Sequence, residues 1–275
     1  MKNGALPGTG VAAGPDNGRR RQPAPLILLS FVLHAAAAAT VAVRPDWWQW
    51  GLGVLAGNYL LLGVAVMFPR ARWLGPNLVR LPEAAVRRGE VCITFDDGPD
   101  PEVTLKVLEI LDRYQARASF FCVGREAEAQ PELVREIARR GHSVESHSNI
   151  HSNAFALFGW FRLKREVDSA QDILARITGR KPQFFRAPVG FRSPLLHPIL
   201  VSRGLHYVSW TRRGYDAVSR NPVAVVRRLT QGLAAGDILL LHDTRPIVLE
   251  VLPDLLDKLA AAGLRSVTLP SACGD

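Results

Sequence analysis

The chain has 275 residues, with 34 lysines and arginines against 25 aspartates and glutamates, and a formal net charge of +9 at pH 7. Such a basic chain suits an anionic membrane surface or a phosphorylated substrate, but no nucleic-acid-binding motif accompanies the charge, so a nucleic-acid partner is not expected. The three cysteines, Cys92, Cys122 and Cys273, have neither metal-binding nor redox spacing, which argues against a disulfide framework.

The N-terminal part of the chain differs in composition from the rest. Residues 1–25 are rich in glycine, proline and arginine without apolar periodicity, and are predicted to be a disordered basic tail. Two uncharged apolar stretches follow, Leu26–Val43 and Trp47–Phe68, and each is long enough to cross a membrane as a helix. A cluster of tryptophans at the start of the second weakens the alternative, a buried core helix. Residues 69–89 are predicted to link this pair to a catalytic domain over residues 90–270.

The arginines around the two apolar stretches predict their orientation. Arg19–Arg21 precede the first stretch and further arginines follow the second, whereas the short loop Arg44–Asp46 between them is formally neutral. The positive-inside rule therefore favours a multi-pass hairpin in a bacterial-type inner membrane, with both ends at the cytoplasmic face. Cleavage of the first stretch as a signal peptide would leave the second as a stop-transfer segment, again with the domain inside. If the first stretch did not span the membrane, the domain would lie outside.

From Glu90 onward, strand-like runs alternate with amphipathic helical runs. Strands are predicted at Val91–Phe95, Ala118–Val123, His142–Ser146, Gln183–Arg186, Leu205–Val208, Ile238–Leu241 and Arg265–Leu269. Helices are predicted around Val103–Tyr114, Pro131–Arg140, Val167–Ile177, Pro222–Ala234 and Ile247–Ala262. Roughly seven strand–helix units indicate an α/β fold with a parallel sheet, most simply a (β/α) barrel. An open doubly wound sheet is the alternative, although no Gly-x-Gly-x-x-Gly follows the first strand to support a dinucleotide site.

The first predicted strand ends in two adjacent carboxylates, Asp96 and Asp97, followed by the turn Gly98-Pro99. Neighbouring side chains of an extended strand point to opposite faces, so these two are expected to need different partners. Two carboxylates at the end of a buried strand are costly unless a metal, an arginine or a histidine neutralises them. A simple acidic turn is the alternative if this stretch is taken alone.

Two histidines four residues apart, His147 and His151, follow the third predicted strand. At this spacing the two imidazoles can face one side of a turn or helix and share a metal. Together with a carboxylate from another strand end, they supply a two-histidine, one-carboxylate set with open positions for water.

Further polar residues follow the later strands. Arg186 precedes a loop that contains proline and glycine, Trp210 and Asp216 follow the next strand, and His242 follows a buried apolar run. Catalytic residues of α/β barrels gather at the carboxyl ends of strands. Any one of these residues could be structural, but their recurrence at this position favours an active site.

These motifs resemble those of the polysaccharide deacetylase family, also called carbohydrate esterase family four. The likeness runs from about Glu90 to Leu269 and rests on Thr94-Phe95-Asp96-Asp97-Gly98-Pro99, His147-Ser148-x-x-His151, Arg186-Ala187-Pro188-x-Gly190 and Leu240-Leu241-His242, in the family's order. The resemblance implies Asp96 as catalytic base oriented by Arg186, and His242 as general acid supported by Asp216. It implies Asp97, His147 and His151 as ligands of a divalent metal ion, most simply zinc. Val189, Trp210 and Leu240 are the corresponding candidates for the substrate and oxyanion side of the site.

The sequence departs from the family pattern at three positions. Val189 replaces an aromatic residue of the third motif, Ala217 replaces the tryptophan that usually follows Asp216, and Arg213 stands at the first acidic position of the fourth motif. These changes predict a reshaped sugar pocket. The expected function is metal-dependent removal of an N-acetyl or N-formyl group from an amino sugar of a glycan or a lipid-linked saccharide. The alternatives are an O-acetyl esterase on the same fold and an inactive, membrane-tethered saccharide-binding protein.

Overall fold

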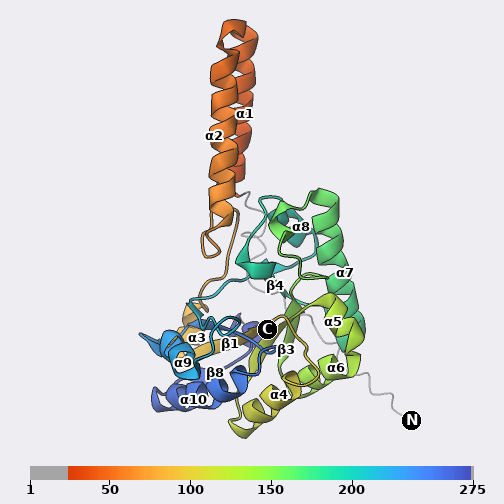
Figure 1. Ribbon diagram of the computed structural model, residues 1–275, viewed down its shortest axis with the longest axis vertical. Coiled ribbons are helices and arrows are strands. Elements are labelled where there is room, and N and C mark those ends of the chain that lie inside the picture. Colours follow the sequence, from red (N-terminus) through yellow and green to blue (C-terminus); the bar gives the residue numbers. More distant parts are fainter. Residues whose placement is uncertain (1–23, 274–275) are drawn as a thin grey trace, which may run out of the picture.

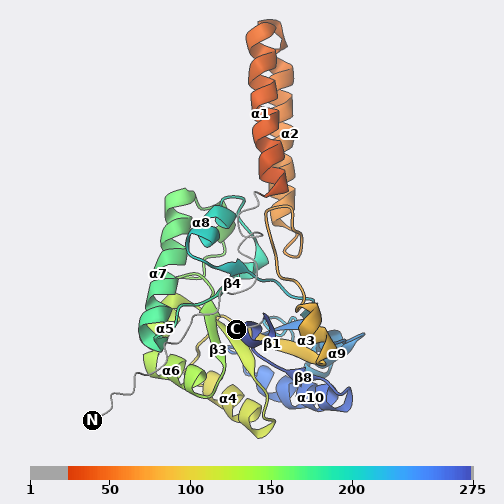
Figure 2. The ribbon, with the colours of Figure 1, turned by 180° about the vertical axis from the view of Figure 1, so that it is seen from behind.

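The computed structural model describes residues 24–273, so most of the predicted basic tail lies outside the described residues. Two long helices, α1 (Pro25–Val43) and α2 (Trp48–Val66), are joined by the short helix η2 (Pro45–Trp47). They lie side by side as a hairpin that projects from the rest of the molecule (Figures 1 and 2). By length and composition, both are apolar enough to cross a membrane.

The remainder of the chain is built on a parallel sheet, as the alternation of strands and helices predicts. Its strands are β1 (Glu90–Asp96), β2 (Ala118–Cys122), β3 (Ser143–Ser146), β4 (Phe184–Phe185), β5 (His206–Tyr207), β6 (Arg212–Arg213), β7 (Ile238–His242) and β8 (Arg265–Ser266). They run in the order β5-β4-β3-β2-β1-β7-β6, and β8 pairs with the start of β1. Within residues 24–273 the path is open between β5 and β6, so the barrel is incomplete.

Helices surround this sheet. They are α3 (Glu83–Arg87), α4 (Thr104–Arg113), α5 (Gly124–Ala129), α6 (Pro131–Arg139), η3 (Phe155–Leu157), α7 (Trp160–Thr178), η4 (Pro188–Gly190), α8 (Leu196–Ser202), α9 (Pro222–Thr230), α10 (Val248–Ala261) and α11 (Leu269–Cys273). The five predicted helices are present, although α7 begins earlier and α9 ends earlier than expected. Helices α3, α5, α8 and α11 and strand β6 were not predicted, because each is too short to show a periodic pattern.

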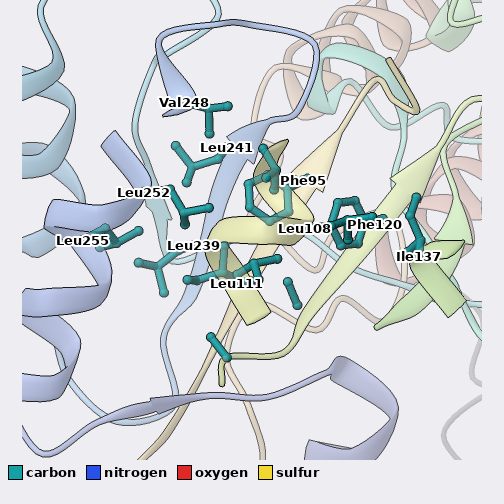
Figure 3. Close-up of a cluster of buried hydrophobic side chains, with 14 of the residues drawn as sticks. Phe95, Leu108, Leu111, Phe120, Ile137, Leu239, Leu241, Val248, Leu252 and Leu255 are labelled. Atoms are coloured by element: carbon teal, nitrogen blue, oxygen red, sulfur yellow. The ribbon is translucent and has the colours of Figure 1, made fainter. Parts of the chain in front are cut away.

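Alternate residues of β1 divide between two apolar clusters, and this decides where Asp96 points. Val91, Ile93 and Phe95 pack outward with α4, α6, α9 and α10, and Figure 3 shows part of this cluster. Cys92 faces the other way, into a smaller inner cluster. Since strand side chains alternate, Thr94 and Asp96 share the inner face with Cys92. Cys92 and Cys122 are buried free thiols that pack as small apolar side chains.

Residues 69–89, predicted as a linker, pack closely against the sheet. Leu78 bridges to Val208 beside β5, in the region where the strand path is open. Leu81 and Ala85 are buried in the inner cluster. This segment therefore covers the open side of the barrel and fixes the hairpin to the domain, which the composition of the segment alone did not indicate.

Candidate active site

Asp96 and Asp97 both face the same site, at the carboxyl end of β1. Asp97 has a φ of 77°, so the backbone leaves the extended conformation directly after the strand. As a result, Asp96 Oδ2 lies 3.8 Å and Asp97 Oδ1 lies 3.4 Å from the same atom, His147 Nε2. Because the strand ends at Asp96, the two carboxylates do not point to opposite faces as they would along an extended strand. The prediction that they need different partners is confirmed: Asp96 pairs with Arg186, whereas Asp97 lies against the imidazoles of His147 and His151.

Gly98 is required by the close approach of another buried carboxylate, Asp243. A Cβ built on Gly98 would lie 2.3 Å from Asp243 Oδ2, and the Thr104 hydroxyl donates a 2.6 Å hydrogen bond to that oxygen. Burial raises the pKa of Asp243 to about 7. Asp243 thus ties the start of α4 to the end of β7, a role that sequence reasoning missed.

His147 and His151 lie on a turn rather than a helix. Ser148 and His151 have φ values of 63° and 50°, and His151 Nε2 lies 3.0 Å from Asp97 Oδ1. The buried carboxylate of Glu166, on α7, accepts hydrogen bonds of 3.0 and 3.1 Å from the backbone N–H groups of Asn149 and Ile150. Glu166 therefore holds the turn in shape, and only its unexpected position on the buried face of a helix could have drawn attention to it.

The tautomer of His147 follows from its hydrogen bond. His147 Nδ1 lies 2.9 Å from the carbonyl oxygen of Arg186, which can only accept, so Nδ1 carries the hydrogen. His147 Nε2 is therefore left with its lone pair facing Asp97. A backbone carbonyl in this position is the usual support of a metal-binding imidazole.

The donor atoms of Asp97, His147 and His151 lie within 4.8 Å of one another, close enough to share one cation. Burial opposes the ionisation of Asp97, but its interactions with the neighbouring imidazoles of His147 and His151 outweigh burial and hold its pKa well below the ordinary value. For His151, burial acts to lower the pKa, and the hydrogen bond and charge of Asp97 more than offset it. One anionic oxygen and two imidazole nitrogens are a donor set that fits zinc or another divalent transition metal.

Arg186 crosses the inner face of the sheet to reach Asp96. Its side chain is fully buried, and Nη1 donates hydrogen bonds of 2.6 Å to Asp96 Oδ1 and 2.8 Å to Thr94 Oγ1. Nη2 donates a 3.0 Å hydrogen bond to the carbonyl oxygen of Ser209. This arrangement fixes Oδ1 of Asp96 and leaves Oδ2 directed at the donor set.

His242 ends β7 and pairs in register with Asp96 at the end of β1. As predicted, Asp216 lies within hydrogen-bond distance of its ring: Oδ1 is 3.0 Å from His242 Nδ1, and Oδ2 accepts a 2.7 Å hydrogen bond from the His242 backbone N–H. Burial acts to lower the pKa of His242, but the hydrogen bond and charge of Asp216 outweigh it and raise the pKa. The imidazole is thereby oriented and kept protonated to higher pH.

The other three predicted residues lie on the loop and strand beside this constellation. Val189 has a φ of 59° and is partly exposed, whereas Trp210 and Leu240 are buried in the inner cluster. Gly190 lies against Trp210, since an added Cβ would come within 2.6 Å of Trp210 Cη2. Leu240 pairs in register with Thr94, so it lines the inner face below the site rather than its mouth.

The chain is similar to proteins of known activity over this same region. A family model described as polysaccharide deacetylase matches residues 83–208. A peptidoglycan-N-acetylglucosamine deacetylase of Bacillus cereus is 31% identical over 188 residues, which cover 67% of this chain and 68% of the relative. A chitooligosaccharide deacetylase of Azorhizobium caulinodans is 34% identical over 160 residues, covering 58% of this chain and 76% of the relative.

The fold is similar as well. The structure of a family 4 carbohydrate esterase from Streptomyces lividans, in complex with acetate, superposes with a TM-score of 0.62 and 31% identity, covering 65% of this chain and 91% of that one. The chain therefore belongs to the polysaccharide deacetylase family and is a hydrolase of the carbohydrate deacetylase class.

Proposed function

We propose that this protein is a metal-dependent deacetylase that removes the N-acetyl group of an amino sugar in a glycan or a lipid-linked saccharide. The observation that carries the proposal is the convergence of three groups at one edge of the sheet. These are the Asp96–Arg186 pair, the His242–Asp216 pair, and the three donors Asp97, His147 and His151. The names of the relatives support an N-acetylated saccharide as the substrate class.

The residues divide the reaction between them. The donor set would hold a divalent cation, which when bound polarises the amide carbonyl and activates a water molecule. Asp96, held by Arg186, is placed to accept the proton that this water loses on attack. Because an amine leaves poorly as an anion, protonated His242 must give its proton to the amide nitrogen as the carbon–nitrogen bond breaks. We assign stabilisation of the developing oxyanion in part to the backbone N–H of Val189.

The test uses the full chain in detergent, loaded with zinc. It is incubated with an N-acetylglucosamine oligosaccharide, its N-formyl analogue and an O-acetylated sugar, and released acetate and formate are measured. We expect acetate from the N-acetyl substrate, and we expect Asp96→Asn to abolish its release. Acetate from the O-acetyl sugar alone would mean an esterase. No product from any substrate, with metal bound, would favour an inactive binding protein.

A membrane-bound substrate is supported by the contact between the hairpin exit and the site. Pro69 follows shortly after α2, and a Cβ built on Gly190 would lie 3.3 Å from its Cβ. Its neighbour Arg70 donates a 3.3 Å hydrogen bond to the carbonyl oxygen of Thr211, one residue from Trp210. If α1 and α2 span the membrane, the third-motif loop lies next to the point where the chain leaves it. A saccharide attached to a lipid would then be held close to this loop.

We also propose that the catalytic domain lies at the cytoplasmic face of the membrane. The arginine distribution favours the cytoplasmic face, whereas the Bacillus cereus relative is named for peptidoglycan, which lies outside the cytoplasm. A reporter that is active only outside the cytoplasm, fused after Asp275, distinguishes the two. An inactive reporter is expected from a two-span hairpin. Strong activity would mean that α1 does not span, and the cytoplasmic substrate would be ruled out with it.

A further inference from the structure

A pocket lies beside the His242–Asp216 pair, on the side of the site where the sequence departs from the family pattern. It has a volume of about 420 Å³ and is lined by Tyr215, Val218, Ser219 and Arg228. Tyr215 immediately precedes Asp216, the carboxylate that orients His242. Because Tyr215 and Asp216 are consecutive, the pocket adjoins the segment that holds the His242 ring.

Two arginines face the ring of Tyr215. The guanidinium carbon of Arg213 lies 5.0 Å from the ring centroid and that of Arg228 lies 5.9 Å from it. Arg213 also lies 5.3 Å from the ring of Trp210, so its guanidinium contacts two aromatic side chains. Cation–π contacts of this kind hold a guanidinium in place without neutralising its charge.

Neither arginine has an acidic partner within the part of the chain that the structure describes. Arg212, which precedes Arg213, differs in having such a partner, because its Nε lies 2.5 Å from the buried carboxylate of Asp237. Arg228 makes one long hydrogen bond, 3.5 Å, to the carbonyl oxygen of Gly214, and Nε of Arg213 is buried without a hydrogen-bond partner. Two adjacent cations without a counter-ion repel each other, and a bound anion would relieve that repulsion.

The backbone at Tyr215 supports a binding role. Tyr215 has a φ of 58°, which is uncommon for a bulky residue, and half of its side chain is exposed. Conformations of this kind persist where the surrounding structure enforces them, often at ligand sites. The ring of Tyr215 lies outside the apolar inner cluster and contacts both arginines.

We propose that this pocket binds an anionic substituent of the saccharide, a carboxylate or a phosphate. Arg228 lines the pocket, and Arg213, which does not line it, would reach the anion from beside the Tyr215 ring. The inference rests on the proposed function, because it assigns the substrate class of the same site. A guanidinium presents its donors in a planar fork that matches both kinds of oxyanion. The reversal of charge at position 213, from the acidic residue of the family pattern to arginine, then becomes a determinant of specificity.

The test compares three saccharides that share one N-acetylglucosamine unit: a neutral oligosaccharide, its carboxyalkyl ether and its phosphate ester. kcat/KM is measured for the full chain in detergent and for Arg213→Gln and Arg228→Gln. Each substitution should lower the ratio of anionic to neutral kcat/KM about ten-fold, the lower end for a lost charge-assisted hydrogen bond, and should act through KM. Arg227→Gln, an exposed neighbour with the same loss of charge that does not line the pocket, should leave the ratio within two-fold of the parent, about the size of a surface effect.

The outcomes distinguish failure of anion binding in the pocket from failure of the deacetylase function. A change confined to the carboxylate or to the phosphate substrate identifies the anion. An unchanged ratio in both variants, or an equal change in Arg227→Gln, overturns the inference while leaving deacetylation intact. If no saccharide is hydrolysed, the proposed function fails, and binding of the three saccharides to Asp96→Asn by calorimetry still tests the pocket. Arg228 is exposed, so its substitution should fold even if Arg213→Gln does not.

Discussion

The carboxyl ends of β1 and β3 carry the candidate metal donors Asp97, His147 and His151. The carboxyl end of β7 and the segment after β6 carry the His242–Asp216 pair and the pocket beside Tyr215. On the first side the side chains are fixed by backbone geometry: Asp97, Ser148 and His151 all have positive φ values, and the buried Glu166 holds the turn. On the second side His242 and Asp216 are buried, but Tyr215, Val218 and Arg228 beside them are exposed.

We infer that the constrained side serves the reaction itself, whereas the exposed side serves the choice of substrate. A donor set tolerates little displacement, so its backbone is constrained and its residues match the family motif. A pocket for a substituent needs only complementary charge and shape, so its residues can change while the acid pair next to it is kept. Each substitution below changes one side of the site, and the properties of the other side serve as its control.

The largest effect is expected on the β1–β3 side. Asp97→Ala removes the only anionic donor of the set, so bound zinc should fall from about one ion per chain to near none, and acetate release should fall to background. Metal content is measured by elemental analysis of the purified chain. Glu102→Ala, which removes an exposed carboxylate from the same loop, serves as the matched control and should retain metal. Full metal retention in Asp97→Ala would remove Asp97 from the donor set.

On the β7 side, His242→Ala should leave metal binding intact and impair turnover. Loss of a general acid lowers kcat by about 10²–10⁴-fold. Steady-state kinetics and metal content are measured on the same preparation, with a melting curve to show that the protein is folded. Turnover close to that of the parent would exclude His242 from proton delivery, and a loss of metal would show that the two sides are not independent.

Arg186 holds Asp96 on the β1 side, and its substitution should affect stability as well as activity. Arg186→Met leaves Asp96 buried without its partner, which should cost about 3–5 kcal/mol of unfolding free energy. For a domain of this size that corresponds to a melting temperature lower by roughly 6–20 °C. Asp96→Asn/Arg186→Met removes both charges, and calorimetry should show that it recovers part of the loss. A single variant as stable as the parent would contradict the buried ion pair.

The smallest expected effect is a displacement along the pH axis. Asp216 raises the pKa of His242, and the reaction needs His242 protonated, so activity should be lost as pH rises through this pKa. Asp216→Asn keeps an acceptor for the ring N–H and removes the charge, so the alkaline limb of the kcat profile should move to lower pH. A profile that does not move would mean that Asp216 only orients the ring.

The segment before β1 illustrates what composition could not reveal. Residues 69–89 have no long apolar period, yet Asn77 is buried, and its amide oxygen accepts a 3.0 Å hydrogen bond from the Ser209 hydroxyl. The carbonyl of Ser209 in turn accepts from Arg186. The segment before β1 is therefore linked to Arg186 through Ser209, which lies 132 positions after Asn77 in the sequence. A local pattern carries no information on such a pairing.

The sequence by itself predicted the order of the main strands and helices, the polar residues at the strand ends and the candidate donor and acid residues, because these depend on local periodicity and short motifs. Only the tertiary structure decided that Asp97 turns back toward His147, that Glu166 supports the histidine turn, and that Arg213 and Arg228 meet at Tyr215. The physical reason is the same in each case. Positive φ values, buried hydrogen bonds and unpaired cations are set by neighbours from distant strands, whose positions are fixed only when the barrel packs.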